Sequence, residues 1–331
     1  MPTVTQTGTI ATLTATERVE LLFEPVVRSI LDYGRYSIMR GVDTEKSIAY
    51  IRQMEKILQR RVGCGFTPKG KNTIYDRKIR VNPFKAEISV CLDNLENTLF
   101  TDVSSRPAGE NYAFSDPRGV FAQQLVLSMR QAIEDDIFRL FWFGHENSTD
   151  PFYNQLNGIW GHYVPELVAN GDLNPIDAGS GAALQPGDGL AILKEMYYAQ
   201  SKELRGIPRQ QKNFMVSSNI FDQFQEDIRA LGGGDAGRMQ TINGMDTPTL
   251  EGIPVTEELI WDTTAEDATG AVSQNYAILT TPRNLIIATD NESNRNVVEF
   301  WNDQTEQTSN ARVQFKMGAN YMHPSLMVVA Q

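Results

Sequence analysis

Three histidines, His145, His162 and His323, are the side chains best suited to acid–base chemistry in this sequence. Nucleophilic catalysis needs a base of this kind within reach of a hydroxyl or thiol. Neither His145 nor His162 stands near a Gly-x-Ser-x-Gly segment, the turn that exposes the serine of many hydrolases. A soluble α+β enzyme with a site in residues 145–190 remains an alternative, with His145 or His162 as the active base.

Metal and cofactor chemistry finds little support in the residue spacing. Cys64 and Cys91 stand 27 positions apart without a CxxC or HxxxH pattern, so the sequence predicts no zinc site, and we expect two free thiols. The glycine-rich run at 232–238 follows a predicted helix and lacks a Gly-Lys-Ser/Thr ending, so it reads as a helix exit rather than a phosphate loop. We therefore predict no catalytic residue, no cofactor and no metal.

Acidic clusters could also hold a metal or act as an acid–base pair. They are Glu134 to Asp136, and Glu257 with Glu258. Consecutive acids on a helix point in different directions, so the sequence favours a solvated or interface surface for both clusters.

The charge of the chain is uneven. Its 30 Lys and Arg against 41 Asp and Glu give a net charge of −11, which disfavours general attraction to nucleic acid phosphates. From Ile51 to Arg80, however, the chain has nine basic and two acidic residues, which gives a local charge of +7. Such a segment is either a solvated surface or a contact for the acidic surface of another copy.

A long helix after Pro117 is the strongest structural signal. Ser115 or Asp116 suits its N-cap, Pro117 its first position and Gly144 a left-handed stop. Apolar residues recur every three or four positions along it. We expect this stripe to pack as a core spine, and its members include Phe121, Leu125, Met129, Ile133, Ile137 and Phe141.

The segments on either side of the spine differ in pattern. Residues 1–16 suit an extended arm, and 16–34 and 43–63 are predicted helices, the second with an apolar stripe from Ile48 to Leu58. Strand-like runs at 72–81 and 86–92 predict a ribbon that rests on a second copy. Residues 147–189 read as loops, and alternating helices and strands follow.

The order of these elements resembles the major capsid proteins of tailed bacteriophages, whose shell fold is shared with encapsulins. The resemblance covers about residues 51–331. It rests on the strand-rich loop before the spine, the steps NFMVSSNIFDQF and LEGIPVTEEL, and the ending ARVQFKMGANYMHPSLMVVAQ.

The resemblance implies an α+β fold with four parts. These are an N-terminal arm with helices at 1–59, an extended β-hairpin loop at 60–113, a peripheral domain at 114–149 and 291–331, and an axial domain at 150–290. Inter-subunit contacts on the extended loop are expected at Lys69, Lys71, Arg77, Lys78 and Arg80.

The function implied is that of a non-enzymatic subunit, located in the virion after assembly in the host cytoplasm. It would form pentamers and hexamers of an icosahedral shell around double-stranded DNA, which it would enclose without sequence-specific binding or a membrane. Scaffolding, portal and decoration proteins are the expected partners, and the scaffold is either separate or an N-terminal segment. An encapsulin-like compartment is the structural alternative.

Overall fold

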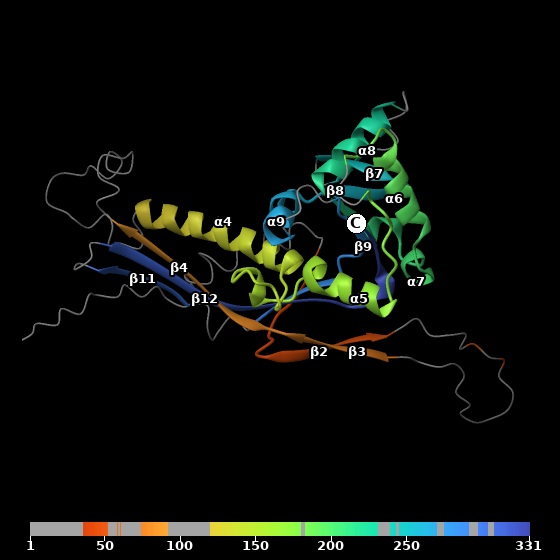
Figure 1. Cartoon of the computed structure of the whole chain (residues 1–331). Helices are drawn as coiled ribbons and strands as arrows, with labels where there is room; N and C mark the ends of the chain where they lie inside the picture. Colours follow the sequence, from red (N-terminus) through yellow and green to blue (C-terminus); the bar gives the residue numbers. More distant parts are fainter. Residues whose placement is uncertain are drawn as a thin grey trace, which may run out of the picture.

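The computed structural model describes residues 36–51, 58, 60, 74–91, 120–179, 183–230, 239–242, 245–269, 275–290, 297–303 and 308–331. They form two sheets, a two-stranded ribbon and the helices that cover them (Figure 1). The predictions for the arm, the helix at 16–34 and the glycine-rich run at 232–238 lie outside these residues. No helix in the described part of the chain is long and apolar enough to cross a membrane.

The predicted spine is helix α4, Val120–Phe143, which is about 36 Å long at 1.5 Å per residue. It lies along the first sheet in Figure 1. Met129, Ile133, Ile137 and Phe141 are buried in the main core, while the side chains of Phe121 and Leu125 lie outside the described residues. The apolar stripe therefore faces the sheet wherever its side chains are described.

The first sheet is built around β12, Thr308–Tyr321. The strand order is β1-β10-β12-β11, and β4 also pairs with β12. The bounds of the other strands are β1 Ser37–Met39, β4 Asn82–Cys91, β10 Leu285–Thr289 and β11 Val297–Asp303. The predicted strands at 86–92 and in the C-terminal third of the chain are thus present.

Alternate side chains of β10 belong to two different cores, one on each face of the first sheet. Leu285 and Ile287 belong to the main core beneath α4, whereas Ile286 and Ala288 belong to a second, smaller core on the opposite face. Successive side chains of a strand point to opposite faces, so a strand covered on both faces reads as a continuous apolar run.

The smaller core holds the ribbon of β2, Glu45–Ile51, and β3, Ile74–Arg80. The prediction of a helix at 43–63 is wrong for residues 45–51, which pair with 74–80 in an antiparallel register, and most of 52–63 lies outside the described residues. The apolar stripe that suggested a helix contains Ile48, which packs with Ile79 in the ribbon core instead. Helical periodicity and strand alternation coincide over so short a segment.

The predicted pairing of the two strand-like runs is also wrong. β3 pairs with β2, whereas β4 pairs with β12 from Asn82↔Met317 to Cys91↔Thr308. Nor does the described part of the ribbon depend on a second copy for support, since it rests on β10 and β12 of its own chain. Gly318 permits this approach, because an added Cβ would lie 3.2 Å from Val81 Cγ1 and closer still to Arg80.

The second sheet has the order β13-β9-β5-β8-β7-β6. Helices α6, α8 and α9 pack around it (Figure 1), and we call this assembly the α/β unit. The strands are β5 Asn213–Val216, β6 Met239–Ile242, β7 Met245–Leu250, β8 Ile253–Glu257, β9 Ala277–Thr280 and β13 Met327–Ala330. The helices are α6 Asp188–Tyr198, α7 Lys202–Arg205, η5 Arg209–Gln211, α8 Ser218–Ala230, α9 Leu259–Thr269 and η7 Pro324–Leu326.

The central strands of this sheet separate two cores. In β5, Phe214 and Val216 face the core beneath α6 and α8, whereas Met215 faces the main core. β9 and β13 alternate in the same way. Each strand is therefore buried on both faces, which is why its sequence lacks polar alternation.

Residues 147–189 were expected to be loops, but three helical segments interrupt them: η3 Tyr153–Gln155, η4 Ile159–Tyr163 and α5 Val164–Asn170. Trp160 of η4 joins Trp142 of α4 and Trp261 of α9 in a buried cluster, with Trp142 and Trp261 ring centroids 4.7 Å apart. The aromatic residues at the end of α4 are thus core packing rather than the lining of a ligand site.

Gly144 ends α4 for a different reason from the one predicted. Its φ is not positive, so it is not a left-handed stop. Instead the chain packs tightly here: Gly158 N donates to Gly144 O at 2.7 Å, and an added Cβ on Gly144 would lie 2.6 Å from Leu140 O. These glycines are required by close backbone contact.

Replacing Gly158 with alanine tests this packing. An added Cβ would meet Leu140 O, Gly144 N and Phe141 O at 2.6 to 2.8 Å, so Gly158→Ala should lower the free energy of unfolding by about 1–3 kcal/mol. Urea unfolding measures the change. The matched control is Gly206→Ala, whose new Cβ would lie 3.4 Å from its nearest neighbour, and which should be neutral or stabilising by up to about 1 kcal/mol.

Candidate assembly interface

The ribbon of β2 and β3 carries Arg77, Lys78 and Arg80 of the basic segment. Lys78 Nζ lies 2.8 Å from Glu45 Oε1, and Arg80 lies 4.0 Å from the same carboxylate. The hydrogen bond with Lys78 lowers the pKa of Glu45 and raises that of Lys78. Because these side chains lie in solvent, the pair adds little stability, and the ribbon remains a charged surface.

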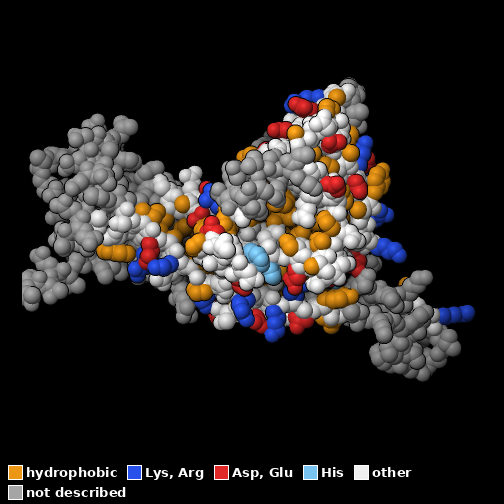
Figure 2. Space-filling view, viewed as in Figure 1, with side chains coloured by type: hydrophobic (Ala, Val, Ile, Leu, Met, Phe, Trp, Pro, Cys, Tyr) orange, Lys and Arg blue, Asp and Glu red, His pale blue; other side chains and the backbone are white. Residues whose placement is uncertain are grey.

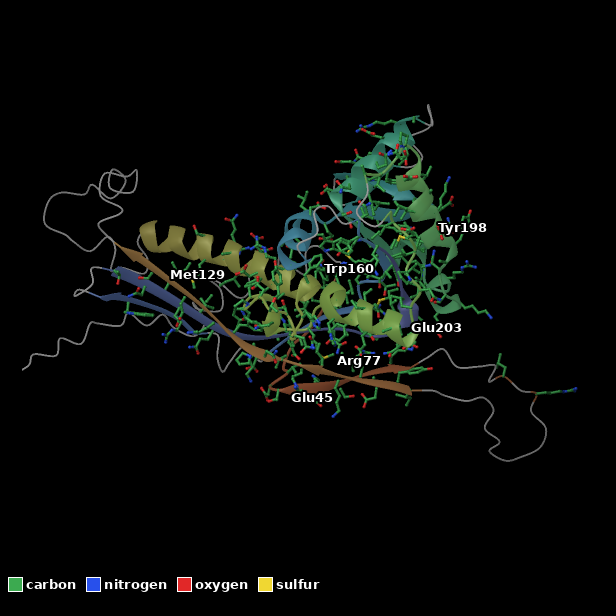
Figure 3. All side chains as sticks on the ribbon, viewed as in Figure 1. Glu45, Arg77, Met129, Trp160, Tyr198 and Glu203 are labelled. Atoms are coloured by element: carbon green, nitrogen blue, oxygen red, sulfur yellow. The ribbon has the colours of Figure 1, made fainter. Side chains whose placement is uncertain are left out.

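Arg77 has a different environment from its neighbours. Its guanidinium carbon lies 3.9 Å from the ring centroid of Tyr321, at the end of β12. The preceding residue of β12, Asn320, donates from Nδ2 to Lys78 O at 2.9 Å. Arg77 therefore fastens the ribbon to its own chain, and Figure 3 shows it between the ribbon and the body.

A second fastening lies further along the ribbon. The His323 ring stands 4.9 Å from Tyr50 and 4.7 Å from Tyr75, measured between centroids, and these tyrosines are a cross-strand pair. His323 Nδ1 lies 2.7 Å from Ser325 Oγ, which in turn donates to the Glu203 carboxylate. We call this set of contacts the histidine clasp.

The clasp does not have the geometry of a catalytic triad. In a triad the histidine lies between the serine and the carboxylate, so that it can take the proton of the hydroxyl. Here Ser325 lies between His323 and Glu203, and its hydroxyl donates to Glu203. The arrangement orients side chains and does not prepare a nucleophile.

The other two histidines also meet. The rings of His145 and His162 are 5.4 Å apart, and His162 Nε2 lies 3.7 Å from Glu166 Oε2. His162 also contacts the Tyr163 ring. These side chains thus contact aromatic rings and Glu166.

A cavity of about 250 Å³ lies where the base of the ribbon meets the segment after α4. Its lining comprises Glu45, Lys78, Arg80, Asn82, Glu146, Leu156, Asn157, Tyr163 and Ala319. Both signs of charge are present in this lining, so it has no clear preference for one ionic ligand. Tyr163 donates to Ala319 O at 3.1 Å, and burial raises its pKa to about 12.

The five residues predicted to contact a neighbouring subunit therefore fall into three groups. Lys69 and Lys71 lie outside the described residues, Arg77 is held against Tyr321, and Lys78 and Arg80 are exposed. The histidine clasp was missed at the sequence level. Its only signal was a tyrosine in each of two segments, and recognising it required the register that pairs Tyr50 with Tyr75.

The carboxylates considered at the sequence level do not form a metal site in the part of the chain that the structure describes. No group of three His, Cys, Asp or Glu residues there is arranged to hold an ion. Asp136 lies 3.4 Å from Arg139, and burial raises its pKa. Cys91 lies at the end of β4, and Cys64 is outside the described residues.

No protein-family model matches this sequence, and no curated protein is similar to it. The fold, however, is that of solved phage structures. A chain of the satellite phage P4 procapsid including the size determination (Sid) protein superposes with a TM-score of 0.54 at 10% identity, covering 92% of this chain and 98% of that one.

Two further structures agree. A chain of the cyanophage A-1(L) capsid asymmetric unit gives a TM-score of 0.51 at 13% identity, with 92% of each chain covered. A chain from Gordonia phage Cozz gives 0.51 at 11% identity, covering 92% of this chain and 86% of that one. The α+β phage capsid fold implied by the sequence is confirmed.

The tyrosine against Arg77 gives a pH-dependent prediction. Burial raises the pKa of Tyr321 to about 12, so between about pH 10 and 12 the unfolded chain loses this proton while the folded chain keeps it. The free energy of unfolding should therefore fall with rising pH in this range. Tyr321→Phe removes this contribution, and urea unfolding at pH 9 and 11.5 should show a smaller fall than in the wild type.

Tyr198→Phe is the matched control, because Tyr198 is 68% exposed. Its pH profile should follow that of the wild type. If Tyr321→Phe also followed the wild type, the assigned burial of the Tyr321 hydroxyl would be contradicted.

Proposed function

We propose that this chain is a structural subunit, the major capsid protein of a tailed bacteriophage, and that it is not an enzyme. It assembles into pentamers and hexamers of an icosahedral shell that encloses double-stranded DNA. The observation that carries the proposal is the superposition of nearly the whole chain on chains of phage capsid structures. The histidine geometry supports a non-enzymatic role, since no described histidine is arranged to activate a nucleophile.

The strand pairing supports a division of the proposed subunit into parts. We place the extended loop at residues 45–80, because β2 and β3 are its paired strands. The peripheral domain comprises α4 and the first sheet. The axial domain is the α/β unit, which also takes β13 from the C-terminal segment because β13 pairs with β9.

The proposed mechanism is assembly by many modest contacts. A subunit that touches several neighbours is held by their combined effect, so single contacts can stay weak and reversible until the shell closes. Lys69, Lys71, Lys78 and Arg80 supply charges on the loop for a neighbouring copy, whereas Arg77 fixes the loop on its own body. The net charge of −11 opposes tight binding of the enclosed DNA.

Scaffolding, portal and decoration proteins are the proposed partners of the assembled shell. An encapsulin-like compartment has the same requirement for self-assembly and differs in its cargo, which would be protein rather than DNA. The enclosed material therefore separates the two structural readings.

Electron microscopy of the purified full chain tests the proposal. We expect closed particles, formed alone or with a scaffold, that contain DNA when assembled with the packaging components. Hollow particles holding a protein cargo would favour the compartment. A chain that stays monomeric at every concentration, with a turnover lost in His145→Ala or His162→Ala, would favour the enzyme.

The loop charges give a separate prediction. Lys69→Glu with Lys71→Glu should abolish particle formation, because these charges would then repel an acidic neighbour. The thermal unfolding of the monomer should be unchanged. Lys69→Arg with Lys71→Arg is the matched control and should assemble like the wild type. Normal particles from the glutamate variant would contradict the role given to these two lysines.

A further inference from the structure

The parallel strands β5 and β8 give the α/β unit two distinct ends. Phe214 pairs with Val255 and Val216 with Glu257, so both strands begin at one edge and finish at the other. Lys212 and Ser217 are five residue steps apart along the chain, so these edges are separated by about 16 Å at 3.3 Å per step. In Figure 1, α7 and α9 lie on opposite sides of these strands.

The edge where the strands begin is basic. The segment 202–212, which contains α7 and η5, has four basic residues and one acid. The basic residues are Lys202, Arg205, Arg209 and Lys212. The register of β9 against β5 brings Thr280 beside Asn213, so Arg283 follows β9 at the same edge. Lys and Arg atoms line this side of the α/β unit in Figure 2.

The charges at this basic edge are only partly offset within the chain. Arg205 donates to a carbonyl, that of Tyr198, and not to an acid. Arg209 lies 3.8 Å from Glu251. Lys212 is buried and donates to Gln200 Oε1 at 2.7 Å, and its pKa is lowered by burial and by the nearby Arg209 and Arg205. A positive potential therefore remains at this edge.

The edge where the strands finish is acidic. The segment 257–269, which contains α9, has five acids and no basic residue: Glu257, Glu258, Asp262, Glu266 and Asp267. Asp262 accepts a hydrogen bond from the Ser218 backbone N–H at the start of α8. This acidic edge therefore differs in sign from the basic edge across the same pair of strands.

Each edge also presents one exposed apolar side chain. Tyr198 at the basic edge is 68% exposed and Leu259 at the acidic edge is 69% exposed. Figure 3 shows Tyr198 at the outer border of the α/β unit. Interfaces combine apolar side chains of this kind with a charged rim. Both edges thus have the composition of a contact surface.

We propose that the basic edge of one copy binds the acidic edge of the next copy, with Tyr198 and Leu259 in or near the contact. The two edges are different surfaces of the same molecule, so the contact is head-to-tail and generates a ring when the rotation closes. This inference rests on the proposed function and names the contact between α/β units, apart from the contact made by the loop.

The direction of the ribbon agrees with this arrangement. In Figure 1 the free end of β2 and β3 extends toward the same side as α7. The ribbon and the basic edge of one copy are therefore directed at the same neighbour. That neighbour presents its opposite side, where α9 packs against α4 through Trp261 and Trp142.

Changing the charge of each edge tests the contact. Lys202→Glu with Gln211→Glu makes the basic edge less positive and leaves the bonds of Arg205 and Arg209 intact. Glu257→Lys with Glu258→Lys makes the acidic edge less negative. Each variant alone should raise the protein concentration needed for half-maximal assembly at least about tenfold, since the attraction between the two edges is then weakened. Light scattering and sedimentation velocity measure this concentration.

The decisive variant carries all four substitutions in one chain. The four substitutions exchange the signs of charge at the substituted positions, so these positions can attract each other again across the contact, and assembly should recover toward the wild-type concentration. Gln225→Glu with Arg229→Glu on α8 changes the net charge by the same amount as the basic-edge variant and should assemble normally. Thermal unfolding of every variant separates loss of contact from loss of fold.

The outcomes distinguish this inference from the proposed function. If the wild type assembles and both single-edge variants assemble equally well, the inference is wrong and the capsid role stands. If the four-substitution chain stays unassembled while folded, the pairing of these edges is also wrong. A basic-edge variant that assembles normally but loses affinity for a DNA duplex would make that edge a nucleic acid surface. A wild type that never assembles would overturn both.

Discussion

The double use of β12 is the constraint on which the rest of the structure depends. One face of this strand carries alternating apolar residues into the main core against α4, including Val313, Phe315 and Met317. Its other face receives the ribbon at Gly318 and Asn320, where a larger side chain at Gly318 would collide with Arg80. Because one strand serves both layers, the direction of the ribbon is set by the same backbone that positions the spine helix.

This dependence explains why the functional features are surfaces and not a pocket. The described histidines are committed to rings, to Ser325 and to Glu166, and the one charged cavity considered above mixes both signs. The ribbon and the two edges of the α/β unit, by contrast, are charged surfaces and not catalytic pockets. A chain organised in this way is suited to contact with its own copies.

Sequence patterns predicted the elements with long, regular signals. The spine helix, β5, α8 and the C-terminal strands follow from periodicity and from caps, because each depends mainly on residues within the element. β2 was predicted as a helix because its apolar residues fit either period over seven positions, and only pairing with β3 decides between them. α9 was missed because its eleven residues lack a clear apolar stripe, and Trp261 is buried by contacts with distant segments.

The candidate interface was predictable in its charge and not in its geometry. The basic segment before residue 80 is evident from composition, but the contact of Arg77 with Tyr321 joins residues 244 positions apart and has no local signal. The basic and acidic edges are likewise plain in the sequence once β5 and β8 are known to run parallel. Parallel pairing joins strands that are distant in the sequence, so the sequence alone did not predict that the two segments lie at opposite edges of one unit.

The histidine clasp has a mechanical consequence. Tyr50 and Tyr75 touch His323, His323 bonds Ser325, and Ser325 bonds Glu203 of α7, so an unbroken series of side chains runs from the ribbon to the edge of the α/β unit. A displacement of the ribbon would therefore act on α7 through these contacts, and a displacement of α7 would act on the ribbon. The ribbon and the basic edge of the α/β unit are thereby mechanically coupled.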